Sequence, residues 1–331
     1  MLHTPLCDLV GIDVPIFVAP MGFVTGAELA AAVSNAGGLG IMSFNGNPPE
    51  ALRQEIRRLR GMTDKPFGVN VLLPRATPAH VAVCLEEKVP LLSLFWSDPS
   101  PYVEAAHAAG VKVVDQVGSV AAARRSAAAG VDIIIAQGVE AGGHVAGNIA
   151  AMALIPRVAD AIAPAPVVAA GGIADARGLV AALALGAQAV SIGTRFLATP
   201  EAAAHPVYKQ KVLEATEEDT VRTTLYGYNW PRAPHRVLRT PFVEQWLGQE
   251  ERGQQSRSDE PIVGETVIDG RRVPVPRFLG FTPSIHTTGD ISSMAHYAGQ
   301  GVGLVREIQP AAAIVREIAD GARQIIQSLA G

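Results

Sequence analysis

Short, nearly continuous apolar runs recur along the N-terminal part of the chain. Such runs are typical of strands that are buried on both faces of a parallel sheet. Ala-rich segments with helical periodicity separate them, for example residues 26–37, 119–130 and 176–186. The pattern predicts strands that alternate with helices, and it places the strands at residues 16–21, 39–44, 67–73, 91–96, 112–117, 132–137, 167–172 and 189–194.

The ends of the predicted helices support this alternation. Several of these helices finish with a glycine shortly before the next strand, where a helix C-cap favours a residue that tolerates positive φ. The glycines in question are Gly37, Gly110, Gly130 and Gly186.

The number of repeats favours one α/β architecture, the (β/α)8 TIM barrel. Strand–helix repeats spaced about 20–28 residues apart are expected for such a barrel. An open doubly wound sheet shares the alternation, but it usually has about six strands and carries a G-x-G-x-x-G turn after the first of them. Here the first predicted strand ends in Ala19-Pro20-Met21-Gly22, so we favour the barrel.

The repeat stops after Thr194. The following segment contains a helix-like stretch at residues 206–219 and a polar run at residues 248–261, which we expect to be an exposed loop. Residues 309–330 have the pattern of an amphipathic helix that packs on the outside of the barrel. We therefore expect a barrel built from residues 1–200 and 284–331, with an insertion subdomain at residues 201–283 on its catalytic face.

Composition narrows the class of protein. The chain has 331 residues, of which 48% are hydrophobic and 18% charged, so it can bury a large core. These figures exclude a disordered or collagen-like chain. A net charge of −4 without a basic cluster argues against nucleic-acid binding, and no apolar stretch is suited to spanning a membrane. Cys7 and Cys84 are too few for a disulfide framework, and no leader pattern opens the chain, so we expect a cytoplasmic protein.

Two glycine-rich strand ends are candidates for binding phosphate. The seventh predicted strand ends in Gly171-Gly172 and the eighth in Gly193-Thr194. Barrels commonly bind phosphate after these two strands, because backbone N–H groups can approach the anion there. The alternative is that the glycines simply end the strands.

The loop after the sixth predicted strand is a candidate for proton transfer. It contains Glu140, Gly142, Gly143 and His144. Imidazole titrates near neutrality and can act as a base or an acid, and the glycines suggest that backbone lies close to a ligand. A solvated loop with an ordinary histidine is the alternative. Glu140 could instead only accept hydrogen bonds from loop N–H groups.

Three amides stand near strand ends, at Asn70, Gln116 and Gln137. Buried amides are costly unless they are paired, and several in one barrel mouth would suit a heterocycle with donors and acceptors, such as an isoalloxazine ring. Each could also satisfy only neighbouring backbone. We expect Asp115 to be a buried, paired carboxylate. The remaining histidines are expected mostly at the surface: His80, His107, His205, His235, His286 and His296.

No zinc-protease, serine-hydrolase or P-loop pattern is present, and we predict no metal site. Instead the chain resembles the nitronate monooxygenase family, formerly called 2-nitropropane dioxygenases, which are FMN-dependent (β/α)8 flavoproteins. The matching segments are PIFVAPMGFVTGAELAAAVSNAGGLG, PFGVNVLLP, GVEAGGH, VVAAGGIADARGLVAALALGAQAVSIGTRFLAT and HYAGQGVG.

The resemblance implies roles for individual residues. Beside the flavin it places Ala19, Pro20 and Met21. Facing the isoalloxazine or the ribityl chain it places Asn70, Gln116 and Gln137. Near the ring it places Gly142 and Gly143, and around the phosphate Gly171, Gly172, Gly193 and Thr194. The loop that closes over the cofactor corresponds to Tyr297–Gln300. His144 matches the family's catalytic histidine.

The implied activity is FMN-dependent oxidation of alkyl nitronates, and of nitroalkanes, with O2 to carbonyl compounds and nitrite. Val18 and Val71 depart from the Gln and Phe of many family members, so the substrate class stays open. The alternative is an NAD(P)H-dependent reductase of quinones or enoyl thioesters. In it Trp230, Arg232 and Arg236 are candidates for contacting a phosphate, although a solvated surface is the expectation we favour for them. A flavin-binding sensor without turnover is a third hypothesis. The apolar outer helices are compatible with a homodimer.

Overall fold

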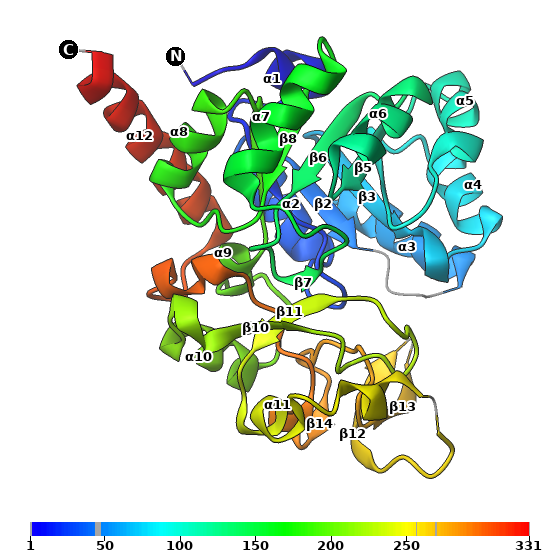
Figure 1. The fold of residues 1–331 in the computed structure, drawn as a ribbon. Helices are drawn as coiled ribbons and strands as arrows, with labels where there is room; N and C mark the ends of the chain where they lie inside the picture. The colour runs from blue at the N-terminus through cyan, green and yellow to red at the C-terminus, as the bar shows by residue number, and fades with distance from the viewer. Residues whose placement is uncertain (1, 44–47, 256, 269, 331) are drawn as a thin grey trace.

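Eight parallel strands form the central sheet of the chain (Figure 1). The structure is a computed structural model and describes residues 2–43, 48–255, 257–268 and 270–330. The strands follow the order β1-β9-β8-β6-β5-β4-β3-β2. Their bounds are β1 Ile16–Val18, β2 Gly40–Ser43, β3 Phe67–Leu72, β4 Leu91–Phe95, β5 Lys112–Val117, β6 Ile133–Gln137, β8 Val167–Ala170 and β9 Ala189–Ile192.

The sheet closes into a barrel between its first two strands. Phe17 forms a parallel bridge with Leu39. The Leu39 N–H donates to the Ile16 carbonyl at 2.9 Å, and the Val18 N–H donates to the Leu39 carbonyl at 3.0 Å. The barrel prediction is therefore confirmed, and the open doubly wound sheet is excluded. All of the predicted strands are present; the last residue of the one predicted at 39–44, Phe44, lies outside the described residues.

Helices surround the barrel. The last of them, α12 (Ala311–Ala330), packs against α2 and α8 and completes the ring, as the amphipathic pattern predicted. The four glycines predicted as helix ends all have positive φ, from 74° to 92°. The other outer helices are α2 Ala27–Asn35, α3 Pro49–Arg60, α4 Pro78–Glu86, α5 Ser100–Ala108, α6 Val120–Ala128, α7 Ala151–Ile162 and α8 Ala176–Ala184.

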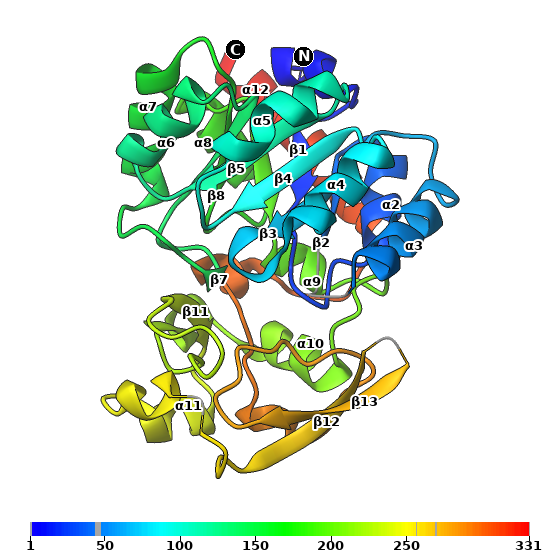
Figure 2. The same cartoon turned by 90° about the vertical axis from the view of Figure 1, so that its right-hand side faces the viewer.

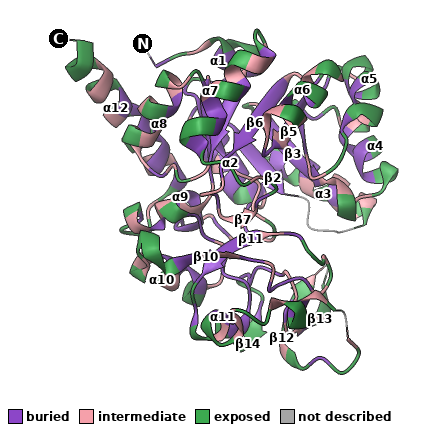
Figure 3. Ribbon diagram, in the orientation of Figure 1, coloured by how far each residue is buried: buried purple, intermediate pink, exposed green. Residues whose placement is uncertain are grey.

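The core has two parts. The larger lies between the strands and the outer helices. The smaller fills the barrel interior, where α1 (Pro5–Val10) contributes Leu6 and Cys7 to a cluster with Phe17 and Ile135. The barrel strands are largely buried (purple in Figure 3). Apolar side chains of this cluster fill the end of the barrel near α1, and the polar inward positions lie at the opposite end, where the strands finish. That carboxyl end is the one on which barrels place their active sites.

The insertion forms a separate layer below the carboxyl end of the barrel (Figures 1 and 2). One small sheet runs in the order β10-β11-β7, and its last strand belongs to the loop after β6. A second sheet runs in the order β13-β12-β14. The elements of this part are β7 Gly143–His144, α9 Thr194–Leu197, α10 Pro206–Glu214, β10 Thr220–Thr223, β11 His235–Leu238, α11 Pro241–Trp246, β12 Ile262–Ile268, β13 Arg271–Pro276 and β14 Thr288–Gly289.

The insertion has its own apolar core. One cluster gathers around Tyr226 and Phe278, and another around Phe281 and Met294. Strand β14 pairs with β12 although it follows residue 283. The boundaries of the insertion subdomain at residues 201 and 283 stay a prediction. Within the described ranges, no helix is both long and apolar enough to cross a membrane.

Candidate active site

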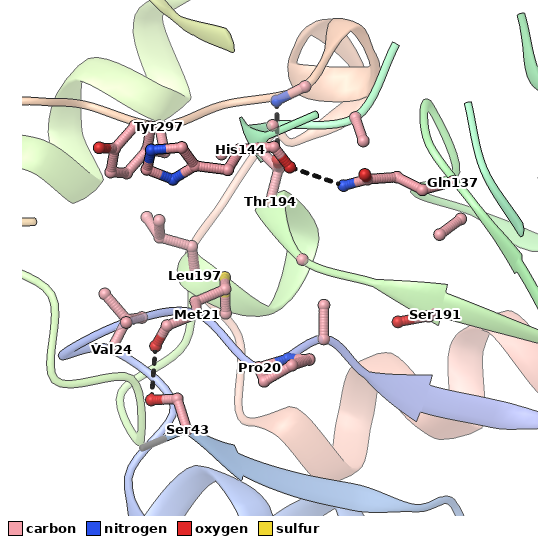
Figure 4. Close-up of a pocket in the computed structure, with 18 of the residues that line it drawn as sticks. Pro20, Met21, Val24, Ser43, Gln137, His144, Ser191, Thr194, Leu197 and Tyr297 are labelled. Carbon is pink, nitrogen blue, oxygen red and sulfur yellow. Dashed lines mark hydrogen bonds between the residues drawn. The ribbon is translucent and has the colours of Figure 1, made fainter. Parts of the chain in front are cut away.

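One pocket opens at the carboxyl ends of the barrel strands (Figure 4). Tyr208, Trp230 and Thr282 of the insertion also line it. It collects every residue predicted for the site except Gln300. The residues that it brings together are Ala19, Pro20, Met21, Asn70, Gln116, Gln137, Gly142, Gly143, His144, Gly171, Gly172, Gly193, Thr194 and Tyr297.

Gln300 lies elsewhere. Its side chain is exposed, and its backbone N–H donates to the Glu140 carbonyl at 2.9 Å. Its neighbours Gly299 and Gly301 do line the pocket, so this segment contributes backbone to the site. A direct contact between Gln300 and the cofactor stays a prediction.

His144 is held in a fixed position between the barrel and the insertion. Its strand, β7, pairs with β11 so that His144 lies opposite His235. Its carbonyl accepts a hydrogen bond from Gln137 Nε2 at 3.0 Å, which Figure 4 shows as a dashed line. Its ring lies 4.3 Å from that of Trp230 and 5.6 Å from that of Tyr297, measured between centroids.

The environment of His144 keeps its imidazole neutral. Burial lowers the pKa of His144 well below its usual value, and the nearby His235 and Arg75 lower it further. Its Nε2 atom is buried and has no hydrogen-bond partner among the residues described. A neutral imidazole that lines a pocket and has an unpartnered nitrogen can accept a proton from a bound substrate.

Two arginines from the insertion, the buried Arg236 and the half-buried Arg222, hold the loop that carries His144. Arg236 donates from Nε and Nη2 to the Val139 carbonyl at 3.2 and 3.0 Å. Arg222 donates to the carbonyls of Val145 and Gly147, each at 3.3 Å. Hydrogen bonds from charged donors are stronger than neutral ones, so these contacts set the loop's course on both sides of His144.

Glu140 has a structural role in the same loop. Both of its carboxylate oxygens accept from the Ala151 N–H at 3.0 Å, at the start of α7. The carboxylate therefore satisfies a free N–H at a helix N-terminus, where negative charge is favoured. The sequence left open whether Glu140 takes part in proton transfer or only accepts hydrogen bonds from backbone N–H groups. This contact supports the second role.

Segment 297–301 forms one wall of the pocket, which Tyr297, Gly299 and Gly301 line. The Tyr208 hydroxyl donates to the Tyr297 carbonyl, and Thr194 Oγ1 accepts from the Gly299 N–H at 3.0 Å. A Cβ on Gly142 would lie 2.6 Å from the backbone of Ala298 and Gly299, so only glycine allows the loop and the segment to approach this closely. The two glycine-rich segments therefore form one continuous wall.

The residues present fit a flavin. Gln137 Oε1 and Ser191 Oγ line the pocket, are buried, and lack a hydrogen-bond partner within the described ranges. Buried polar atoms are costly when unpaired, so a polar edge of a bound molecule would satisfy them. Gly171 and Gly172, with φ of 112° and 70°, bring backbone to the pocket wall at the predicted phosphate position, beside Thr194.

Some sequence expectations need correction. The histidines were expected mostly at the surface, but three of the six are buried: His80, His235 and His296. His80 belongs to a local capping box with Thr77 at the start of α4, whereas His235 and His296 lie against the rings of His144 and Tyr208, which are distant in sequence. Arg236 is also buried and its donors are occupied by the protein itself, so it is not available to a nucleotide phosphate. Asp115 is confirmed as a buried carboxylate, and Ser126 Oγ donates to it at 2.5 Å.

Other pocket residues escaped the sequence analysis. Ser191 is a polar residue within an apolar strand, and Arg75 is a charged residue that ends the short helix after β3, so both could have been noticed in the sequence. Trp230 was considered only as a phosphate contact, whereas it lines the pocket beside His144. No group of three or more potential metal ligands occurs in the described part of the chain.

Comparison with known proteins gives matches along the whole chain. The family described as nitronate monooxygenase matches residues 3–82 and 76–321. A nitronate monooxygenase of Paraburkholderia phytofirmans is 32% identical, with 98% of this chain and 96% of that protein covered. A Mycobacterium tuberculosis protein named (3aS,4S,5R,7aS)-5-hydroxy-7a-methyl-1-oxo-octahydro-1H-indene-4-carboxyl-CoA dehydrogenase is 41% identical, over 73% of this chain and 68% of its own length. Among solved structures, FabK from Thermotoga maritima superposes with a TM-score of 0.82 at 37% identity, over 100% of this chain and 99% of that one.

Proposed function

The chain belongs to the nitronate monooxygenase family of oxidoreductases, which in general depend on a flavin, and on that premise we propose that it is an FMN-dependent nitronate monooxygenase. The substrates are alkyl nitronates and their parent nitroalkanes, which O2 oxidises to carbonyl compounds and nitrite. The observation that carries the proposal is the neutral, half-buried His144, which lines the pocket and whose Nε2 has no hydrogen-bond partner among the described residues.

The cofactor assignment is supported by the polar lining of the pocket. Gln137, Ser191 and Asn70 would face the ring system, and the backbone at Gly172 together with the Thr194 hydroxyl would hold the phosphate. A bound flavin supplies the two-electron redox chemistry, for which protein side chains have no equivalent. The chain's own residues orient the cofactor and exclude water from it.

His144 is the proposed base for neutral nitroalkanes. A nitroalkane loses its α-proton to a base before it can be oxidised as the nitronate anion, and the free Nε2 accepts that proton. Tyr297 Oη is also buried without a partner among the described residues. It can donate a hydrogen bond to a substrate oxygen that becomes negatively charged. A nitronate that is already deprotonated needs the pocket but not the base.

A second candidate function is reduction of an enoyl thioester or a quinone by NAD(P)H. The similarity to the carboxyl-CoA dehydrogenase and to FabK favours it, because both identities, 41% and 37%, exceed the 32% found for the nitronate monooxygenase. In this function His144 would instead exchange a proton with the thioester substrate. The same pocket and cofactor serve both candidates, so the electron donor decides between them.

An anaerobic absorbance titration tests the proposal. The purified full-length protein is loaded with FMN, and its flavin bands are followed with an alkyl nitronate and with NADH in separate cuvettes. Bleaching by nitronate alone supports the monooxygenase. Bleaching by NADH alone contradicts it and supports the reductase. Absence of flavin bands after incubation with FMN contradicts both.

A further inference from the structure

Arg75 stands at the edge of the pocket, on the short helix η1 (Leu73–Arg75) that follows β3. Among the described residues that line the pocket it is the one with a formal charge at neutral pH, because His144 is neutral and no carboxylate is present. The phosphate position proposed above lies after β8 and β9, on other strands of the barrel. A cofactor phosphate held there leaves Arg75 available to another ligand.

The Arg75 side chain is exposed at the pocket mouth, and its guanidinium has no hydrogen-bond or ion-pair partner within the part of the chain that the structure describes. Other arginines near the site are engaged: Arg236 and Arg222 bind loop carbonyls, and Arg195 donates to the Glu307 carbonyl and to Gln309. Arg236, Arg222 and Arg195 therefore have structural roles, whereas Arg75 makes no such contact.

The charge of Arg75 reaches the proposed reaction centre. It lowers the pKa of His144 and acts in the same direction on Tyr297, whose pKa burial raises. Arg75, His144 and Tyr297 all line the same pocket, and Nε2 of His144 and Oη of Tyr297 have no partner among the described residues. A negative group bound there would be attracted by Arg75 and would accept a hydrogen bond from Tyr297.

Apolar side chains connect Arg75 with His144. Leu72 and Phe95 lie opposite each other on β3 and β4, and both line the pocket. The wall continues from Phe95 through Trp96 to Trp230, with ring centroids 5.2 and 5.0 Å apart. Trp230 then stacks on His144, so a cation lies at one end of an apolar wall and a base at the other.

We propose that Arg75 binds the negatively charged group of the substrate, and that the substrate is an organic anion whose apolar part lies along Leu72, Phe95 and Trp230. This inference rests on the proposed function, since it concerns the substrate of the same site. Two classes of substrate are compatible with this proposal, and in both of them the group that Arg75 binds is an anionic oxygen group. It is supplied either by a nitronate, which like a carboxylate spreads one negative charge over two oxygens, or by a phosphate of a coenzyme A thioester.

Binding of unreactive probes tests the proposal independently of turnover. Calorimetry measures the affinity of the FMN-loaded protein and of the protein without FMN for butyrate, for uncharged butyramide and for coenzyme A. The variants are Arg75→Met, which removes the charge at similar length, and Arg75→Lys, which keeps the charge without the planar fork. Arg124→Met on the exposed face of α6 is the matched control.

We expect Arg75→Met to weaken binding of one anionic probe about tenfold, with a smaller effect for Arg75→Lys and none for Arg124→Met. Butyramide binding stays unchanged. Selective loss of butyrate identifies a nitronate-like head group, and selective loss of coenzyme A identifies a phosphate. Equal affinity of wild type and Arg75→Met for both anions, or failure of the wild type to bind either, overturns the proposal. Because no reaction is measured, a protein that does not turn over nitronate can still show the Arg75 effect.

Discussion

Trp230 stacks on the imidazole of His144, with ring centroids 4.3 Å apart and ring planes inclined by 27°. The two residues come from different parts of the chain: His144 from the loop after a barrel strand, and Trp230 from the insertion. The insertion therefore supplies one wall of the proposed base's environment. This contact contributes to the desolvation that keeps the loop histidine neutral.

Removing this wall should change the pH dependence of the reaction. In Trp230→Ala, water reaches His144 and the desolvation that lowers its pKa is reduced, so the pKa rises toward its usual value. Because the base acts only when neutral, the acidic limb of the kcat/KM profile for a nitroalkane should move to higher pH. Trp230→Phe keeps a ring and should shift the limb less. An unchanged profile in Trp230→Ala would show that the stacking has no effect on the base.

His144→Asn should separate the two substrate forms. Loss of general base catalysis typically costs about a hundredfold to ten-thousandfold in rate, and we expect a loss in this range with a neutral nitroalkane. The preformed nitronate should lose much less. Steady-state rates with both forms, together with the flavin absorbance of the purified variant, measure this difference. Loss of FMN binding in parallel with activity would instead mean that His144 is structural.

Gly142→Ala should disrupt the cover of the pocket. The added Cβ would lie 2.6 Å from the backbone of Ala298 and Gly299, which cannot rotate away as a flexible side chain could. Segment 297–301 must then move, and we expect weaker FMN binding, measured by fluorescence titration of the apoprotein. Gly22→Ala is the control, since that glycine also lines the pocket but has open space around its Cβ position.

Arg236→Met should destabilise the protein and loosen the catalytic loop. Arg236 is buried, and its removal leaves the Val139 carbonyl and the Thr220 hydroxyl without their donor. Loss of such charge-assisted contacts costs about 2–3 kcal/mol, which urea unfolding can detect. Arg239→Met removes only an exposed contact to Glu244 and should cost much less. Equal effects of the two variants would contradict the holding role of Arg236.

Stability should fall on acidification below about pH 6.5. Burial lowers the pKa of His235 to about 4 and that of His296 to about 3, so the unfolded chain binds more protons than the folded one as the pH falls from 6.5 toward these values. Asp115 acts in the opposite direction between its usual value and its raised pKa of about 6, but the buried histidines outnumber it.

Urea unfolding at pH 7 and pH 5 measures this effect. His296→Gln should reduce the difference in unfolding free energy between the two pH values, whereas His286→Gln at the exposed surface should leave it unchanged. A wild-type protein that is more stable at pH 5 than at pH 7 would show that the buried histidines do not dominate.

The barrel could be predicted from the sequence because its signals are local. In the sequence, a strand buried on both faces is an apolar run such as that of β6. A helix that ends before a strand is an Ala-rich segment followed by glycine. The ends of successive parallel strands meet at one rim of the barrel. Residues at these ends, such as Asn70 and Gln137, could therefore be assigned to a common site without coordinates.

Only the tertiary structure decided which distant residues contact the residues of the site. Trp230 stacks on His144, and Arg236 donates a hydrogen bond to the Val139 carbonyl, although these residues are far apart in the chain. His296 is likewise buried by segments distant from it in sequence. Local periodicity records whether a residue faces a core, but not which distant surface covers it. The neutral state of His144 depends on the exclusion of water by the packed insertion, so it follows from the folded arrangement and not from any motif.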